Sequence, residues 1–326
     1  MLSLFYLFTM KRLFTLICVL MAFKALGQQQ ILVSQYMLNQ YLINPAVAGT
    51  SDFFEASVGY RLQWAGLEGA PRTFYVTFQG PLGKAPEHYN WRSKKKYHHG
   101  VGASVMVDQT GLLSRTMAYL TYAYNMPINK KIRWSNGLNL GFQQHRIVGS
   151  KVIMDGFDVA LPGVDINKII PDVSVGSWLY SKDFYVGLAA NQIMRNRLDY
   201  SVNRLDEIGR LKYHYFLTGG LRIPFYYNEM EWIPSVMLRY VHPAPMSFDL
   251  NSKIRYKKMY WVGVSYRHRD AVAALVGLTL FESLNIGYSY DLSISGLSSY
   301  HNNSHEFVLS YNIARKYDVL SPNRFW

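Results

Sequence analysis

The chain has 326 residues, of which 49% are hydrophobic and 15% aromatic, and it contains one cysteine. This composition excludes disorder as the main state, and the 26 Tyr and 24 Gly favour strands and tight turns over helices. The formal net charge of +13 favours, for an exported protein, anionic lipid headgroups or an acidic partner over nucleic acid.

Residues 1–27 are predicted to form a secretory signal peptide. Basic Lys11-Arg12 precedes an apolar run from Leu13 to Phe23, and Ala25-Leu26-Gly27 places small residues where a signal peptidase cleaves. The only cysteine, Cys18, lies in this signal, so the exported chain is expected to contain no thiol. Disulfides, cysteine metal sites and thiol catalysis are therefore excluded.

Residues 28–50 are predicted to form an N-terminal plug or a periplasmic segment. They show no clean strand alternation, and Pro45 and Gly49 break regular structure at their end. Their amides suit a polar lumen, while their apolar side chains favour a groove over water. The residues expected to lie in the plug or lumen are Gln35, Tyr36, Asn39, Tyr41, Asn44 and Pro45.

Residues 51–313 are predicted to form a single all-β domain, an antiparallel transmembrane β-barrel. Apolar and small polar residues alternate with a period of two, as in the stretch 286–291. The longest uncharged apolar stretch, 271–281, is far short of the roughly 20 residues that a spanning helix needs. The polar face is small and mostly uncharged, which indicates lipid outside and a polar lumen inside.

The alternation predicts fourteen strands, an even number as in single-chain bacterial barrels. They are expected at 53–63, 72–80, 98–110, 112–126, 132–147, 171–181, 184–191, 212–224, 231–241, 247–256, 259–267, 270–280, 284–294 and 305–313.

The connections between these strands alternate in length. With a periplasmic N terminus, the outer loops include 148–170, 192–211 and 295–304, and the inner turns include 127–131, 182–183, 257–258 and 281–283. The exception is 81–97, a long basic connection that this parity places in the periplasm. Residues 314–326 are expected to form a periplasmic C-terminal tail.

Two surfaces are predicted to contact partners. Outer-loop residues with mixed polar and apolar character are expected to grip a protein client; they are Met154, Phe157, Met194 and Tyr300. Basic residues on the inner side are expected to form a collar for an acidic periplasmic partner or inner-leaflet headgroups; they are Arg92, Lys94, Lys95, Lys96, Arg315, Lys316 and Arg324.

Motifs of soluble enzymes are absent from the sequence. It has no GxxxxGK[ST], GxSxG or HExxH, and Gly100-Val101-Gly102 fits the polar face of a strand. Asp155, Asp158 and Asp165 lack EF-hand spacing, so a solvated loop is favoured over a calcium site, although calcium binding stays open. His98-His99 is interpreted as a strand-end cap, because adjacent strand residues point to opposite faces. We expect no enzymatic activity and no cofactor or metal.

Short motifs along the chain carry a family resemblance. They are the segment 34–49, Arg61-Leu62-Gln63-Trp64-Ala65-Gly66, Gly69-Ala70-Pro71-Arg72-Thr73, Gly80-Pro81-Leu82, Pro234-Ser235-Val236, Tyr240-Val241, Ala244-Pro245, Asp249-Leu250-Asn251, Trp261-Val262-Gly263-Val264-Ser265-Tyr266-Arg267, Asp270-Ala271-Val272, Ile286-Gly287-Tyr288-Ser289-Tyr290-Asp291 and Ser304-His305-Glu306. In order and spacing they resemble the PorP/SprF family of type IX secretion system outer-membrane proteins. The resemblance is weakest between about 145 and 232. It departs at the basic insert 92–96 and at Arg61-Leu62-Gln63, where the family usually has an amide directly after the Arg.

The resemblance implies a non-enzymatic outer-membrane barrel that assists secretion of a large adhesin-type client and anchors it at the surface through the client's C-terminal domain. It also implies a role in gliding motility and a partner that is periplasmic secretion machinery or a peptidoglycan-binding lipoprotein. Two alternatives stay open. One is a barrel that takes up a hydrophobic or small polar solute, and the other is a structural tether between the outer membrane and the cell wall.

Overall fold

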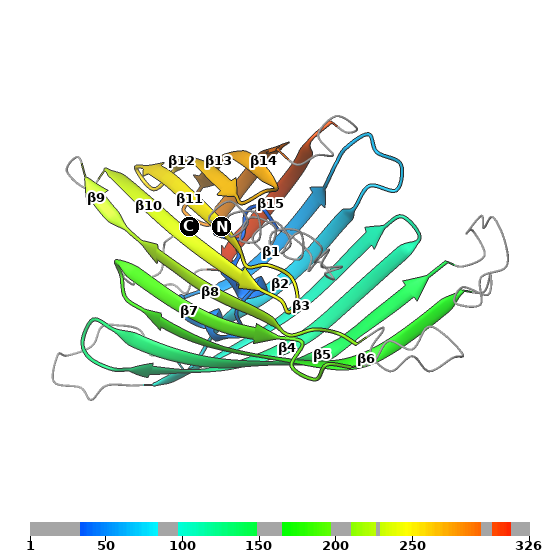
Figure 1. Cartoon of the computed structure of the whole chain (residues 1–326). Coiled ribbons are helices and arrows are strands. Elements are labelled where there is room, and N and C mark those ends of the chain that lie inside the picture. The colour runs from blue at the N-terminus through cyan, green and yellow to red at the C-terminus, as the bar shows by residue number, and fades with distance from the viewer. Residues whose placement is uncertain are drawn as a thin grey trace, which may run out of the picture.

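The computed structural model describes residues 33–83, 97–148, 165–196, 210–225, 229–294 and 302–313. Over these ranges two short 3-10 helices precede an antiparallel sheet of fifteen strands (Figure 1). The elements are η1 (Gln40–Leu42), η2 (Pro45–Val47), β1 (Phe54–Leu62), β2 (Arg72–Leu82), β3 (His98–Thr110), β4 (Leu113–Pro127), β5 (Arg133–Ile147), β6 (Ile166–Tyr180), β7 (Phe184–Asn191), β8 (His214–Leu221), β9 (Ile223–Phe225), β10 (Met230–Tyr240), β11 (Ser247–Tyr256), β12 (Tyr260–Arg267), β13 (Ala271–Leu280), β14 (Leu284–Ser293) and β15 (Ser304–Ile313). Within this part of the chain, no helix has the length and apolar character needed to cross a membrane.

The sheet closes on itself, because β1 pairs with β15 along its whole length, from Phe54 opposite Ile313 to Leu62 opposite His305. β8 and β9 both pair with β10, one after the other, and only Arg222 separates them. Together they form one interrupted strand of the wall. The result is a closed antiparallel barrel of fourteen strands, which confirms the predicted fold class.

The predicted bounds of thirteen strands agree with the structure to within two residues, and β6 is the exception. β6 begins at Ile166, whereas the prediction began it at Pro171 and assigned the preceding residues to an outer loop. Pro171 pairs with Phe142 of β5, while β7 pairs with β6 only from Val175 onward. Proline has no amide hydrogen to donate. It is tolerated at this position because β7 does not pair with β6 there, so no hydrogen bond between these two strands is lost.

Side chains alternate between the outer face and the lumen. In β15, Phe307, Leu309 and Tyr311 are exposed, whereas Glu306 and Ser310 are buried. The apolar face therefore points outward, as the period-two pattern predicts.

Among the described residues, the buried polar side chains are mostly uncharged, as the sequence indicates, but they are not exclusively so. The barrel interior buries several full charges, including Arg61, Glu231, Asp249, Lys253, Arg255, Arg267, Asp291 and Glu306. Many of them pair with one another, as Arg255 does with Glu231. Ion pairing and hydrogen bonds offset the cost of removing such charges from water, so the lumen tolerates them.

The two ends of the barrel differ in their connections. At the end where β1 begins and β15 finishes, the connections include 128–132, 181–183, 257–259 and 281–283; at the opposite end they include 148–165, 192–213 and 294–303. Long connections are extracellular in outer-membrane barrels, so we call these the inner and the outer end. The parity is incomplete, because 83–97 is long on the inner end while 111–112 and 268–270 are short on the outer end.

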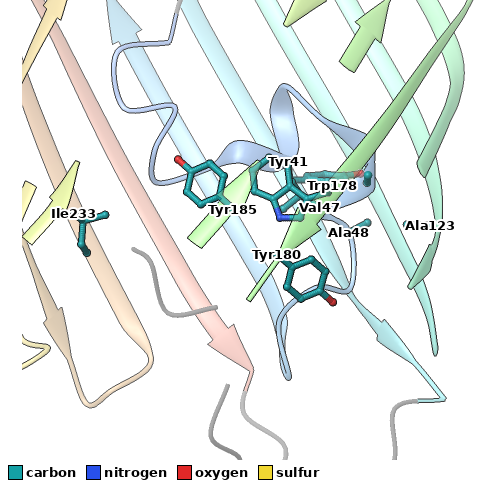
Figure 2. Packing of buried hydrophobic residues seen from close by; sticks show 9 residues of the cluster. Tyr41, Val47, Ala48, Ala123, Trp178, Tyr180, Tyr185 and Ile233 are labelled. Atoms are coloured by element: carbon teal, nitrogen blue, oxygen red, sulfur yellow. The ribbon is translucent and has the colours of Figure 1, made fainter. Parts of the chain in front are cut away.

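Residues 33–50, which we call the N-terminal segment, lie inside the barrel. From Ser34 to Thr50 every residue is buried except Leu42 and Ile43, which are half-buried. Figure 2 shows Tyr41, Val47 and Ala48 of this segment beside Trp178 and Tyr180 of β6, in one buried apolar cluster. The core of this molecule is thus formed between the barrel wall and its own N-terminal residues.

Candidate functional site

A row of small residues in the barrel wall accommodates η2. Gly100, Ala123, Gly137, Gly176 and Ala189 lie directly opposite one another in register across β3, β4, β5, β6 and β7. A Cβ atom on three of these glycines would lie 1.9 to 2.4 Å from atoms of the N-terminal segment. Only a wall without side chains at these positions allows the segment to approach so closely. We call this row the glycine seat.

Asn44 fixes the segment over the glycine seat. Its Nδ2 donates to the carbonyl oxygens of Ser177 at 3.1 Å and Leu188 at 3.0 Å, on β6 and β7. Its Oδ1 accepts from the Ala46 amide at 2.9 Å and so caps η2, where Pro45 occupies the first helical position. One amide side chain therefore shapes the local turn and binds the wall.

Further polar contacts join the middle of the segment to the wall. The Asn39 amide donates to Thr77 of β2 at 2.9 Å, and the Tyr41 hydroxyl hydrogen-bonds Thr121 of β4 at 2.5 Å. The amide of Asn251 on β11 donates to the Tyr36 hydroxyl at 2.5 Å. These bonds reach strands on several sides of the barrel, so the segment is held around the lumen rather than along one strand.

The first residues of the segment are bound by charged side chains. The backbone amides of Ser34 and Gln35 donate to the two oxygens of the Glu306 carboxylate, at 2.7 and 3.2 Å. The Ser34 hydroxyl hydrogen-bonds Asp291 and also accepts from Arg61 and Arg267. We call Ser34, Gln35, Arg61, Arg267, Asp291 and Glu306 the Ser34 cluster.

Ion pairs connect the Ser34 cluster internally and to its surroundings. Arg61 lies 2.9 Å from Asp291 and 3.1 Å from Glu306. Arg267 pairs with Asp270 at 2.8 Å and with Asp249 at 3.7 Å, and Arg239 pairs with Asp249 at 2.7 Å. Three guanidinium groups thus face four carboxylates, a balance of 3 − 4 = −1 within this group.

A cavity lies in the outer half of the lumen, beside the start of the segment. It is bordered by Val33 and Leu42 of the segment and by wall residues that include Tyr119, Asn191 and Arg239. The segment therefore forms part of the lining of this cavity.

All six residues predicted for the plug or lumen are buried inside the barrel. They are Gln35, Tyr36, Asn39, Tyr41, Asn44 and Pro45. They contact the barrel wall at three places: at the Ser34 cluster, through the polar contacts in the middle of the segment, and at the glycine seat. Their role in closing the lumen to solutes stays a prediction that conductance measurements test.

The other predicted site residues fall mostly outside the described part of the chain. These are Arg92, Lys94, Lys95, Lys96, Arg315, Lys316 and Arg324 of the basic collar, Met154, Phe157 and Tyr300 of the outer loops, and Asp155 and Asp158. Met194 is described and is 46% exposed in the outer connection after β7. Asp165 lies 3.6 Å from Arg146 in an exposed ion pair. In the described ranges, no group of three acidic or histidine residues is arranged to hold a metal ion.

His98 and His99 lie at the start of β3, and their side chains have separate environments. The buried His98 ring hydrogen-bonds the Gly49 carbonyl oxygen at 2.8 Å, whereas His99 contacts the Tyr122 hydroxyl at 2.7 Å. The two rings thus bind different partners, which agrees with the expectation that adjacent strand residues do not chelate together.

A closed barrel with an apolar outer face and a polar, charged interior is the architecture of outer-membrane β-barrel proteins. The sequence profile described as "Type IX secretion system membrane protein PorP/SprF" matches residues 25–311. The chain therefore belongs to the PorP/SprF family, which confirms the resemblance seen in the sequence. Family and fold together indicate a non-enzymatic membrane protein of the outer membrane.

Solved structures with a similar fold include two transporters. The toluene transporter TbuX of Ralstonia pickettii superposes with a TM-score of 0.51 and 9% identity, over 85% of this chain and 92% of that chain. The toluene transporter TodX of Pseudomonas putida gives a TM-score of 0.49 and 10% identity, over 87% and 94% of the two chains. At these identities the similarity concerns the barrel fold alone. Among curated proteins, none matches this sequence.

The charged residues around Ser34 were not predicted as a site. Arg61, Asp249, Arg267, Asp270, Asp291 and Glu306 all belong to the motifs that carry the family resemblance. The sequence feature that could have indicated this site is that each of these residues is charged and lies at a polar position of an alternating strand, or directly next to the end of such a strand. Such a charge needs a partner inside the barrel, and the convergence of these motifs becomes visible only once the barrel closes.

Proposed function

We propose that this protein is a type IX secretion system barrel that assists secretion of a large adhesin-type client and anchors it at the cell surface through the client's C-terminal domain. Family membership supports the connection to the secretion system. The observation that carries the choice of role is the occupied lumen, in which the N-terminal segment is bound at the Ser34 cluster and at the glycine seat. A filled and internally bonded barrel suits a rigid membrane anchor better than a passage for solutes.

The outer end supplies the client-facing surface in this proposal. The long connections 148–165, 192–213 and 294–303 carry the residues expected to contact the client: Met154, Phe157, Met194 and Tyr300. The exposure of the Met194 side chain supports its part in this role. Exposed apolar side chains on such loops are suited to bury area against a protein partner.

The inner end supplies the contact with the periplasmic machinery or with a peptidoglycan-binding lipoprotein. The proposed collar consists of Arg92, Lys94, Lys95, Lys96, Arg315, Lys316 and Arg324. The inner turn after β11 adds Lys257 and Lys258, which are exposed. Positive charge at this end favours an acidic partner or anionic headgroups.

Affinity purification of the tagged protein from its own membranes tests the proposal. We expect a large adhesin and a periplasmic partner to be recovered with the unaltered protein. Met194→Glu should reduce recovery of the adhesin and spare the periplasmic partner, whereas the triple change Lys94→Glu, Lys95→Glu and Lys96→Glu should have the reverse effect.

The other readings give different results in the same experiment. Recovery of the barrel with bound lipid and no protein partner supports solute uptake, and recovery of cell-wall components alone supports a tether. Loss of one and the same partner in both variants contradicts the assignment of separate roles to the two ends.

A further inference from the structure

The N-terminal segment runs through the lumen in the direction opposite to β1. Ser34 is bonded to Glu306, the third residue of β15, and to Arg61, the eighth of nine residues in β1, and both positions are at the outer end. At the other end of the segment, the Gly49 carbonyl oxygen bonds His98, the first residue of β3, at the inner end. The chain therefore passes from the outer end to the inner end before β1 returns outward.

The Ser34 cluster has the chemistry of a peptide-binding site. Both oxygens of Glu306 accept successive backbone amides, and the Gln35 side chain donates back to the Glu306 carbonyl oxygen at 3.0 Å. Within the cluster, the two guanidinium groups of Arg61 and Arg267 balance the two carboxylates of Asp291 and Glu306, and the Glu306 oxygens still accept the two backbone amides. Hydrogen bonds that backbone amides donate to a carboxylate are charge-assisted and stronger than those between neutral groups.

Outer connections adjoin this site. The Ala65 amide donates to the Asn303 carbonyl oxygen at 2.8 Å, and the Asn302 amide donates to the Ala65 carbonyl oxygen at 2.7 Å. The Trp64 amide donates to the Ser304 hydroxyl, two residues from Glu306, at 3.0 Å. The connection after β1 and the residues before β15 are thus joined beside the point where Ser34 is held.

We propose that the charged wall residues of the Ser34 cluster form a binding site for the chain's own amino-terminal peptide. By holding Ser34 and Gln35 there, they present the exported amino terminus on the outer side of the membrane. The five residues 28–32 extend at most about 17 Å from Val33 at the length of an extended chain. The amino terminus is then part of the surface that a partner meets at the outer end, although the first strand starts at the inner end.

Labelling of single-cysteine variants with a membrane-impermeant maleimide on intact cells tests the direction. The exported chain is expected to have no thiol of its own, so each variant carries one reactive site. Gln30→Cys reports the amino terminus, Glu68→Cys an exposed outer connection and Lys257→Cys an exposed inner turn. We expect Gln30→Cys and Glu68→Cys to react on intact cells and Lys257→Cys to react only after permeabilisation. Reaction of Gln30→Cys only after permeabilisation, or only after denaturation, overturns the proposal.

Proteolysis tests the binding site itself. Chymotrypsin added to intact cells should cleave between Tyr36 and Tyr41 in the Glu306→Gln variant. The introduced glutamine has only one side-chain oxygen, so it no longer accepts the backbone amides of both Ser34 and Gln35. Glu231→Gln is the matched control, since Glu231 is a buried and ion-paired carboxylate at the inner end, paired with Arg255 and Arg222. Protection of the segment in Glu306→Gln, or equal cleavage in both variants measured by mass spectrometry, overturns the role of the Ser34 cluster.

Discussion

The two ends of the N-terminal segment are held by different physical interactions. At the outer end, Ser34 and Gln35 are bound by carboxylates and guanidinium groups that are themselves paired. At the inner end, residues 44–48 pack on glycines, with backbone approaching backbone. The first arrangement depends on charge balance and the second on the absence of side chains.

This difference predicts two kinds of sensitivity. Removing one partner from a buried charge cluster leaves other charges uncompensated, so the loss spreads to the whole barrel. Adding a methyl group at the glycine seat leaves the charges intact and displaces the segment locally. The following substitutions separate the two effects, in order of expected size.

Substitution of Arg61 should have the largest effect on stability. Arg61→Met leaves Asp291 and Glu306 without their shared cation, and we expect a loss of about 3–5 kcal/mol in the free energy of unfolding. Urea unfolding in lipid vesicles measures it. The control is Arg146→Met, which breaks an exposed pair with Asp165 and should cost about 0.2–1 kcal/mol. Similar losses in both variants would mean that the Ser34 cluster adds nothing beyond a surface ion pair.

Gly137→Ala should displace the segment from its seat. The new Cβ would lie 2.4 Å from the Ala46 amide nitrogen. Overpacking of this kind lowers the free energy of unfolding by about 1–3 kcal/mol. We expect raised ion conductance in planar bilayers. Gly219→Ala is the matched control, because its Cβ has no neighbour closer than 3.7 Å, and it should leave conductance unchanged. Unaltered conductance in Gly137→Ala would show that the segment does not seal the lumen.

Asn44→Ala should loosen the same seat through lost hydrogen bonds. The carbonyl oxygens of Ser177 and Leu188 lose a donor and η2 loses its cap, with an expected cost of about 1–3 kcal/mol. The readout is again unfolding together with conductance. Asn129→Ala serves as the control, since Asn129 bonds only within an exposed inner turn among its described contacts. Conductance raised equally in both variants would argue against a specific role of Asn44.

Tyr41→Phe should have the smallest effect. It removes the hydroxyl that bonds Thr121, but Thr121 keeps its bond to Asn139 at 2.5 Å. We expect a loss of about 0.5–1.5 kcal/mol in unfolding free energy and a closed lumen. A conductance change as large as that of Gly137→Ala would mean that this single bond, rather than the glycine seat, holds the segment.

The barrel was predictable because its pattern is local. Period-two alternation of residues such as Phe307, Leu309 and Tyr311 depends only on which face meets lipid, and this rule identified all fourteen strands. The start of β6 was missed because Pro171 is unfavourable in a paired strand, and only the pairing of β7 shows that the position is permissive.

The site was predictable only in part. The amides and aromatic residues of the segment indicated a polar lumen, and the structure buries them there. The Ser34 cluster and the glycine seat were not predicted, because each depends on register across several strands. Glu306 and Arg61, for example, become neighbours through the β1–β15 pairing, which joins residues at opposite ends of the chain.

That pairing also constrains how the molecule assembles. Ser34 and Glu306 are 272 positions apart, and their bond exists only when the last strand has joined the first. The segment lies inside a wall that is closed by the pairing of β15 with β1, so docking of β15 completes its enclosure. Such distant contacts form late and slowly in folding. The bond between Ser34 and Glu306 is therefore tied to closure of the barrel, and a chain in which β15 has not docked on β1 lacks this enclosure of its own amino-terminal residues.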